Sequence, residues 1–171
     1  MKNHFELFQM PEEFAIDTQQ LDSAYREMQG RVHPDKFVTA TDAEKRVAMQ
    51  WATRANEAYQ TLKSPLKRAI YLCELHGVDL GTESNTSMPM SFLMQQIEWR
   101  ESLDEARASK NQSALEQLES ELQQTRTTLL ALVSQCLNAA QYSEAGEHVR
   151  QLMFVEKFSD DVGHVFELLE A

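Results

Sequence analysis

The spacing of the apolar residues constrains the fold of this chain more than any other feature, because it alternates between four and three along most of the length. One such series consists of Leu21, Tyr25, Met28 and Val32, and a second ends at Leu62. This period places apolar side chains on one face of an α-helix. Glycine and proline, which favour turns, number only 5 and 4 among 171 residues. The pattern predicts an all-α protein.

Capping residues and prolines set the expected boundaries of the helices in the N-terminal half. Asp17 with Gln20, and Thr41 with Glu44, have the spacing of a capping box, which satisfies free N–H groups at a helix start. Pro34 forces the preceding residue out of the helical region and ends the first helix. Two shorter helices are expected beside this pair, one around Phe5, Leu7 and Phe8, and one that begins at Pro65 and includes Arg68, Tyr71 and Leu72.

The C-terminal half follows a break in the helical pattern. Residues 77–91 contain two glycines, a proline and a cluster of Ser, Thr and Asn, which is typical of a linker. Three long helical patterns follow, at 92–108, 113–139 and 142–169. One amphipathic helix cannot bury its own apolar face, so a helical hairpin or bundle is expected, and we predict a three-helix bundle. The predicted parts are residues 1–76, a linker at 77–91, and residues 92–171.

The charge of the chain argues against two classes of partner. The formal net charge is −11 at pH 7. Nucleic acids and anionic membranes attract basic surfaces, so neither is expected to bind. The charge is also unevenly divided, with −1 on residues 1–75 and −10 on residues 76–171. The C-terminal half is therefore expected to present the acidic surface.

Cysteine, histidine and hydropathy patterns indicate no metal site, cofactor or membrane span. Cys73 and Cys136 lie far apart in apolar segments and are expected to be buried free thiols of a reducing cytoplasm. The five histidines lack metal-ligand spacing, and no glycine-rich phosphate loop is present. The longest uncharged segment has 17 residues, fewer than the roughly 20 of a membrane helix. The first residues lack the charged-then-apolar pattern of a signal sequence, so none is expected. We expect a cytoplasmic protein that is not an enzyme.

His33-Pro34-Asp35 is the sharpest local motif. Pro34 fixes the backbone and lacks a donor, so His33 and Asp35 present polar groups on a stiff turn. Alone, the tripeptide is also typical of an ordinary turn. Its context is more specific, because it joins two helices of about four turns each that can pair in antiparallel fashion.

Three features in chain order resemble a J domain, the module of DnaJ-type co-chaperones. They are the His33-Pro34-Asp35 loop, the helix end Asn56-Glu57-Ala58-Tyr59 with Leu62, and Pro65 with Arg68 and Tyr71. The resemblance covers about residues 3–72 and implies docking on a DnaK-type chaperone and stimulation of its ATPase. It implies a chaperone-binding site that consists of His33, Pro34, Asp35, Arg26, Arg31 and Lys36. From the residues alone, Arg26 and Arg31 are more typical of a solvated helix face than of a binding site.

The C-terminal half indicates which family of J-domain proteins the chain resembles. General DnaJ proteins continue with a Gly/Phe-rich segment and Cys-x-x-Cys repeats, whereas here an acidic helical tail follows directly. The segment 92–105 (FLMQQIEWRESLDE) and the junction 75–80 (LHGVDL) resemble the HscB family, the J-type co-chaperones of bacterial iron–sulfur cluster assembly. This resemblance implies that the tail binds the scaffold protein IscU and that the J domain presents it to the chaperone HscA.

A helical projection of the segment after residue 91 separates two apolar faces. The predicted core face consists of Phe92, Trp99, Leu103 and Ala106. The second, roughly 100–200° away, consists of Leu93, Met94 and Ile97, flanked by Glu98, Glu101 and Glu105. An apolar patch with a charged rim is typical of a partner site, and burial of Leu93 and Met94 under the linker or the J domain is the alternative.

The HscB resemblance assigns scaffold contact to this second face and to an aromatic residue of the last helix, which Phe154 matches. The implied scaffold-binding site consists of Leu93, Met94, Ile97, Glu98, Glu101, Glu105 and Phe154. The expected function is therefore that of an adaptor between scaffold and chaperone. Two alternatives remain open: a general J-domain folding co-chaperone with other clients, and a helical enzyme that uses carboxylates of the tail.

Overall fold

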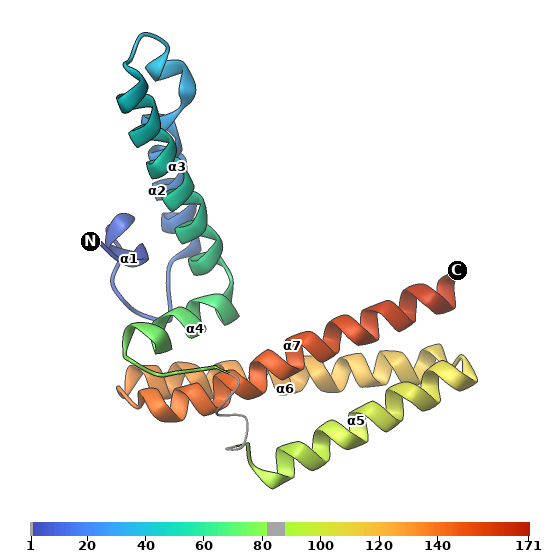
Figure 1. Cartoon of the computed structure of the whole chain (residues 1–171). Helices are drawn as coiled ribbons and strands as arrows, with labels where there is room; N and C mark the ends of the chain where they lie inside the picture. The colour runs from blue at the N-terminus through green and yellow to red at the C-terminus, as the bar shows by residue number, and fades with distance from the viewer. Residues whose placement is uncertain (1, 82–87) are drawn as a thin grey trace. The chain divides into compact units, whose positions relative to one another are not determined.

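The computed structural model of the chain describes residues 2–81 and 88–171, and within these ranges it contains helices and no β-strand (Figure 1). The predicted all-α class is confirmed. None of the helices in the described part is long and apolar enough to cross a membrane. The elements are α1 His4–Leu7, α2 Thr18–Val32, the 3-10 helix η1 Pro34–Phe37, α3 Asp42–Lys63, α4 Pro65–Leu75, α5 Met90–Ser109, α6 Gln112–Asn138 and α7 Tyr142–Glu170.

The chain divides into two compact units, Met1–Leu72 and Cys73–Ala171. In the first unit α2 and α3 form an antiparallel hairpin (Figure 1). Both predicted helix starts are confirmed, since the Asp17 carboxylate accepts the N–H groups of Gln19 and Gln20, and the Thr41 hydroxyl accepts that of Glu44. The caps fix where each helix begins, and the loop between the two helices extends from the end of α2 at His33 to the Thr41 cap of α3.

Residues of α4 close the end of the hairpin at which α2 begins and α3 ends. The buried Arg68 guanidinium donates to the carbonyl of Leu62 at 2.7 Å and lies 4.9 Å from the centroid of the Phe14 ring. Its positive charge therefore satisfies a carbonyl at the C-terminal end of α3, where the helix dipole favours a cation. The Tyr71 hydroxyl accepts the backbone N–H of His4 at 3.0 Å and so fixes α1. Arg68 and Tyr71 thus hold the unit together.

A polar network joins the outer surfaces of α2 and α3. The Asp22 carboxylate accepts hydrogen bonds from the Lys63 ammonium at 2.9 and 3.1 Å and from the Tyr59 hydroxyl at 2.8 Å. The Tyr59 ring also stacks on that of Tyr25, with centroids 4.1 Å apart. The hydrogen bond from Lys63, followed by that from Tyr59, lowers the pKa of Asp22 below its ordinary value.

We expect this lowered pKa to make the stability of the first unit depend on pH. The ionised carboxylate stabilises the fold at any pH above its unfolded pKa of about 3.9, and the contribution disappears as pH falls through the lower folded pKa. Urea unfolding between pH 2 and 7 checks this expectation. Wild type should be more stable than Asp22→Asn by a constant amount above about pH 5, and the two curves should converge in acid. Parallel curves throughout would contradict it.

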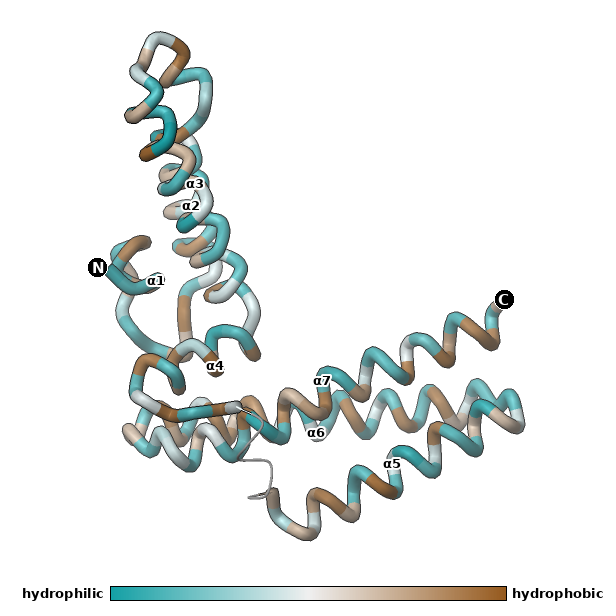
Figure 2. Tube along the Cα trace, in the orientation of Figure 1, coloured by the Kyte–Doolittle hydropathy of each residue, from teal (hydrophilic) through white to brown (hydrophobic). Residues whose placement is uncertain are grey.

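The second unit is built on the antiparallel pair α6 and α7, with α5 alongside (Figure 1). The three predicted helices of the tail are confirmed, with ends that agree to within two residues. Hydrophobic and hydrophilic residues alternate along all three helices, as expected for helices with one buried face (Figure 2). The fully buried side chains at the centre are Leu115, Leu122, Val133, Val149, Leu152, Val155, Phe158 and Val162.

The first residues of the predicted linker pack against α7. Gly77 has a φ of +79°, and the N–H groups of Gly77 and Val78 bond to the carbonyls of Glu74 and Cys73, which together form a Schellman motif at the end of α4. The Arg150 guanidinium then donates to the Asp79 carbonyl at 2.8 Å. Residues 82–87 of the predicted linker lie outside the described residues. The division at residues 76 and 91 therefore stays a prediction.

Gly146 makes the close approach of this segment to α7 possible. A Cβ atom at this position would lie 2.8 Å from Cγ1 of Val78, whereas a Cβ at Gly163 would have nothing within 4 Å. We therefore expect Gly146→Leu to destabilise the second unit by about 2 kcal/mol through overpacking. The matched control Gly163→Leu should not destabilise it, because a Cβ there meets nothing within 4 Å and leucine is a better helix former than glycine. Urea unfolding measures both changes, and equal effects of the two substitutions would contradict the expectation.

Candidate functional site

His33 ends α2 and starts η1, so the loop of the tripeptide is a single tight turn. Its backbone leaves the helical region, with φ −61° and ψ 137°, as predicted from the following proline. The imidazole Nδ1 accepts the N–H of Asp35 at 3.2 Å, and the Lys36 N–H bonds to the His33 carbonyl at 3.0 Å. The first bond holds the ring on the turn, and the second fixes the backbone of the turn. Because Nδ1 accepts a hydrogen bond, the Nε2 atom is the donor of the neutral ring.

The turn presents its polar side chains to solvent. The side chains of His33 and Asp35 are 59% and 89% exposed, and the nearest Asp35 oxygen lies 3.5 Å from Nδ1. Pro34 and Lys36 are also exposed. An open depression beside the turn is lined by Gln29, Gly30, His33, Asp35 and Lys36. A turn whose backbone is fixed while its polar groups remain accessible is suited to binding a partner.

The structure separates the three basic residues of this candidate site. On α2, Arg26 lies on the same face as Gly30 and His33, whereas Arg31 lies about 140° away around the helix. Arg31 instead pairs with Glu27 at 2.5 Å, and both line a cavity on the side of α1. Lys36 therefore lies in the turn itself, whereas Arg26 lies about two helical turns before His33 and its Nε donates to the Asp22 carbonyl at 3.4 Å. The charge of Arg31 is partly neutralised by its own helix.

The second candidate site lies on α5. The predicted core residues Phe92, Trp99, Leu103 and Ala106 are all buried. Leu93, Met94 and Ile97 are not part of this core, with exposed fractions of 37%, 56% and 59%. The carboxylates of Glu98, Glu101 and Glu105 are exposed as well. On the helix these six residues share one side, with the apolar group toward the N-terminal end and the acidic group toward the C-terminal end.

Phe154 lies on the opposite side of α5 from this surface. Its half-buried ring stacks on Trp99 at a centroid distance of 6.3 Å and meets Phe92 edge to face at 5.9 Å. It also stacks on Phe158 at 5.8 Å. Phe154 thus packs α5 onto α7. Only the exposed part of its ring is available to a partner.

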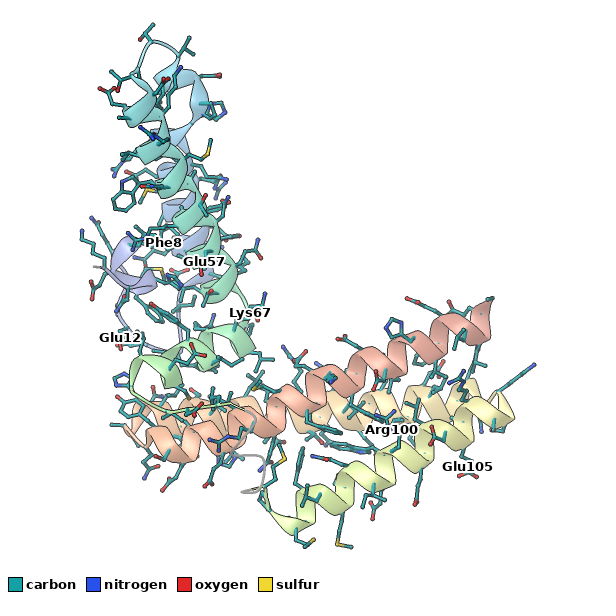
Figure 3. The ribbon with its side chains drawn as sticks, viewed as in Figure 1. Phe8, Glu12, Glu57, Lys67, Arg100 and Glu105 are labelled. Carbon is teal, nitrogen blue, oxygen red and sulfur yellow. The ribbon has the colours of Figure 1, made fainter. Side chains whose placement is uncertain are left out.

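An ion pair also positions α5. The Arg100 guanidinium lies 3.2 Å from the Asp161 carboxylate on α7 and 4.9 Å from the centroid of the Phe158 ring. In Figure 3 Arg100 lies on the side of α5 toward α7, and Glu105 lies further along α5. The exposed face of α5 is therefore held by aromatic and ionic contacts on its other side.

Neither site has the chemistry of a metal centre. No group of three His, Cys, Asp or Glu side chains that could hold a metal ion occurs in residues 2–81 and 88–171. Cys73 and Cys136 are buried free thiols, as predicted. Burial raises the pKa of Cys73 to about 11, which disfavours the thiolate that metal binding or nucleophilic attack requires.

Two apolar surfaces were missed by the sequence analysis. Met90 extends the exposed face of α5 toward its start, and its position four residues before Met94 was the available signal. At the other end of the chain, Val38 and Met49 are exposed near the turn. Whether these two side chains are buried or exposed depends on how α2 and α3 pair. The spacing of apolar residues within either helix does not specify that pairing.

Comparison with known proteins identifies the family. Residues 88–163 match the family described as the HSCB C-terminal oligomerisation domain. A Burkholderia thailandensis protein named Co-chaperone protein HscB homolog is 55% identical over 168 residues, which cover 98% of this chain and 96% of that protein. The chain belongs to the HscB family of co-chaperones.

Solved HscB structures agree with the fold. Chaperone HscB from Vibrio cholerae has a TM-score of 0.87 and 35% identity, and the alignment covers 98% of this chain and 99% of that one. Human co-chaperone HscB has a TM-score of 0.90 and 28% identity over 95% of this chain and 81% of the human chain. The predicted architecture of an N-terminal J domain followed by a C-terminal helical domain is confirmed.

Proposed function

We propose that this HscB-family chain is an adaptor that binds an IscU-type iron–sulfur scaffold protein and delivers it to a DnaK-type chaperone of the HscA class. It stimulates the ATPase of that chaperone and so aids cluster assembly and transfer. The observation that supports this proposal is the presence of two exposed, chemically different surfaces in one co-chaperone. One is the polar turn of the J domain, and the other is the apolar and acidic face of α5.

The J-domain turn is the proposed chaperone-binding site. His33, Pro34 and Asp35 form its centre, because they are exposed and their backbone is fixed by local hydrogen bonds. Lys36 in the turn and Arg26 on the preceding helix provide positive charge, which favours an acidic partner surface and accelerates encounter. Arg31 has the smaller role, since Glu27 already pairs with it.

The face of α5 is the proposed scaffold-binding site. Leu93, Met94 and Ile97 supply apolar area that the unit does not bury, and burial of apolar area by a partner favours association. The rim of Glu98, Glu101 and Glu105 selects a partner with a basic surface. Phe154 packs against the buried side of α5, and the exposed part of its ring extends the proposed binding surface.

The two sites act together by proximity. A scaffold bound to α5 is held near a chaperone bound to the J domain, which raises the effective concentration of one for the other. This role requires no reaction on the chain itself, and we propose that it is not an enzyme, needs no cofactor and works in the cytoplasm.

Selective binding separates this function from that of a general folding co-chaperone. Calorimetric titration with the folded scaffold should give a saturable one-to-one complex. Reduced, unfolded lactalbumin, a general probe for client binding, should give no heat under the same conditions. Binding of unfolded lactalbumin without binding of the scaffold would favour the general folding role instead.

A further inference from the structure

A groove separate from the depression beside His33 adjoins the J-domain turn. Its volume is about 490 Å³, within the roughly 300–1,000 Å³ of many ligand sites. Pro34, Phe37 and Val38 of the loop form one wall, and Ala48, Met49 and Ala52 of α3 form the other. Val38 and Met49 are 71% and 70% exposed. The tip of the hairpin therefore leaves apolar area uncovered beside the turn.

The groove is continuous with the turn that the proposed function assigns to the chaperone. Pro34 is part of both, because it lines the groove while its neighbours His33 and Asp35 line the polar depression. A partner that contacts the tripeptide must therefore also lie against the rim of the groove. This continuity makes the chaperone, rather than the scaffold, the partner that covers it.

The charge of the lining specifies the chemistry of the bound segment. Among the described residues that line the groove, Lys45 alone is charged, and it lies on α3 one turn before Met49. An apolar lining with one cation fits a short aliphatic segment with a neighbouring carboxylate.

We propose that this groove binds a short aliphatic segment of the DnaK-type chaperone, with a carboxylate of that segment paired to Lys45. The proposal rests on the chaperone-binding function above. In this arrangement the tripeptide triggers ATP hydrolysis, and the groove contributes affinity and partner choice. Loss of the groove should therefore weaken binding without lowering the maximal stimulation.

Titration of the chaperone's ATPase with full-length variants tests the proposal. Met49→Glu places a charge in the groove, and Val47→Glu places the same charge on a different side of α3, at another exposed apolar residue. We expect Met49→Glu to raise the concentration for half-maximal stimulation about tenfold, with the maximum unchanged. Val47→Glu should stay within about twofold of wild type. Circular dichroism confirms that both variants are folded.

Two further variants test the charge and separate this proposal from the proposed function. Lys45→Glu should also raise the half-maximal concentration, whereas Lys45→Arg should not. Asp35→Asn should remove the stimulation at every concentration. If Asp35→Asn removes it while Met49→Glu behaves like Val47→Glu, the groove proposal is wrong and the proposed function stands. If Asp35→Asn stimulates normally, the proposed function itself is wrong. Loss of self-association by Met49→Glu with unchanged stimulation would assign the groove to a second copy and overturn the proposal.

Discussion

His33→Gln is expected to reduce the chaperone's ATPase to its unstimulated rate at every concentration of the co-chaperone. The imidazole is held on the turn by the bond from the Asp35 N–H to Nδ1, which leaves Nε2 as the donor toward a partner. Glutamine has neither the ring nor this fixed geometry. Because the His33 side chain is mostly exposed, its replacement removes little packing and the fold should persist.

A matched control distinguishes a lost trigger from a lost fold. His164→Gln makes the same change at an exposed histidine of α7 and should leave the stimulation intact. Both variants should have the thermal melt of wild type, and both should bind the scaffold with unchanged affinity. Normal stimulation by His33→Gln would show that the turn is not the trigger.

The double variant Met94→Ala with Ile97→Ala is expected to weaken scaffold binding by about 2 kcal/mol, or roughly 30-fold in Kd. Both side chains are more than half exposed, so truncation removes apolar contact area from the partner but little from the core. Phe154→Ala is a less selective test, because the ring also packs against Trp99 and Phe158. Titration calorimetry with the purified scaffold measures the change.

Leu168→Ala provides the control for this surface. Leu168 is as exposed as Met94, but it lies near the end of α7 and outside the proposed site. Its truncation should change the affinity by less than about twofold. An equal loss in both variants, or none in the double variant, would place the scaffold elsewhere. Sedimentation of the chain alone would also show whether the face of α5 joins two copies.

Features set by local chemistry were predictable from the sequence. The carboxylate of Asp17 and the hydroxyl of Thr41 cap helices within a few residues of themselves, so their positions determine the helix starts. Exposure of Leu93 and Ile97 likewise follows from the helical period together with the buried Trp99. In each case the deciding interaction lies within one helix.

Features that depend on long-range contact were not predictable. The approach of Val78 to Gly146 joins segments far apart in the chain, and no local pattern marks it. The pairing of α2 with α3 also decides that Met49 lines a groove. Similarly, the ion pair between Arg31 and Glu27 was not predicted, because the basic residues were considered without the acidic residue one turn earlier. Charge counted along the chain overstated the basic surface beside the turn.

The most direct test of the adaptor role mixes two variants that each lack one site. The chaperone's ATPase is measured with the scaffold and with wild type, His33→Gln, Met94→Ala/Ile97→Ala, or an equimolar mixture of the two variants. At micromolar concentrations, wild type and scaffold together should stimulate the ATPase more than the sum of the stimulation by wild type alone and by scaffold alone. This excess is expected because both sites lie on one chain. Each variant should lose this excess, and the mixture should not restore it. Restoration by the mixture would contradict delivery of the scaffold by a single molecule.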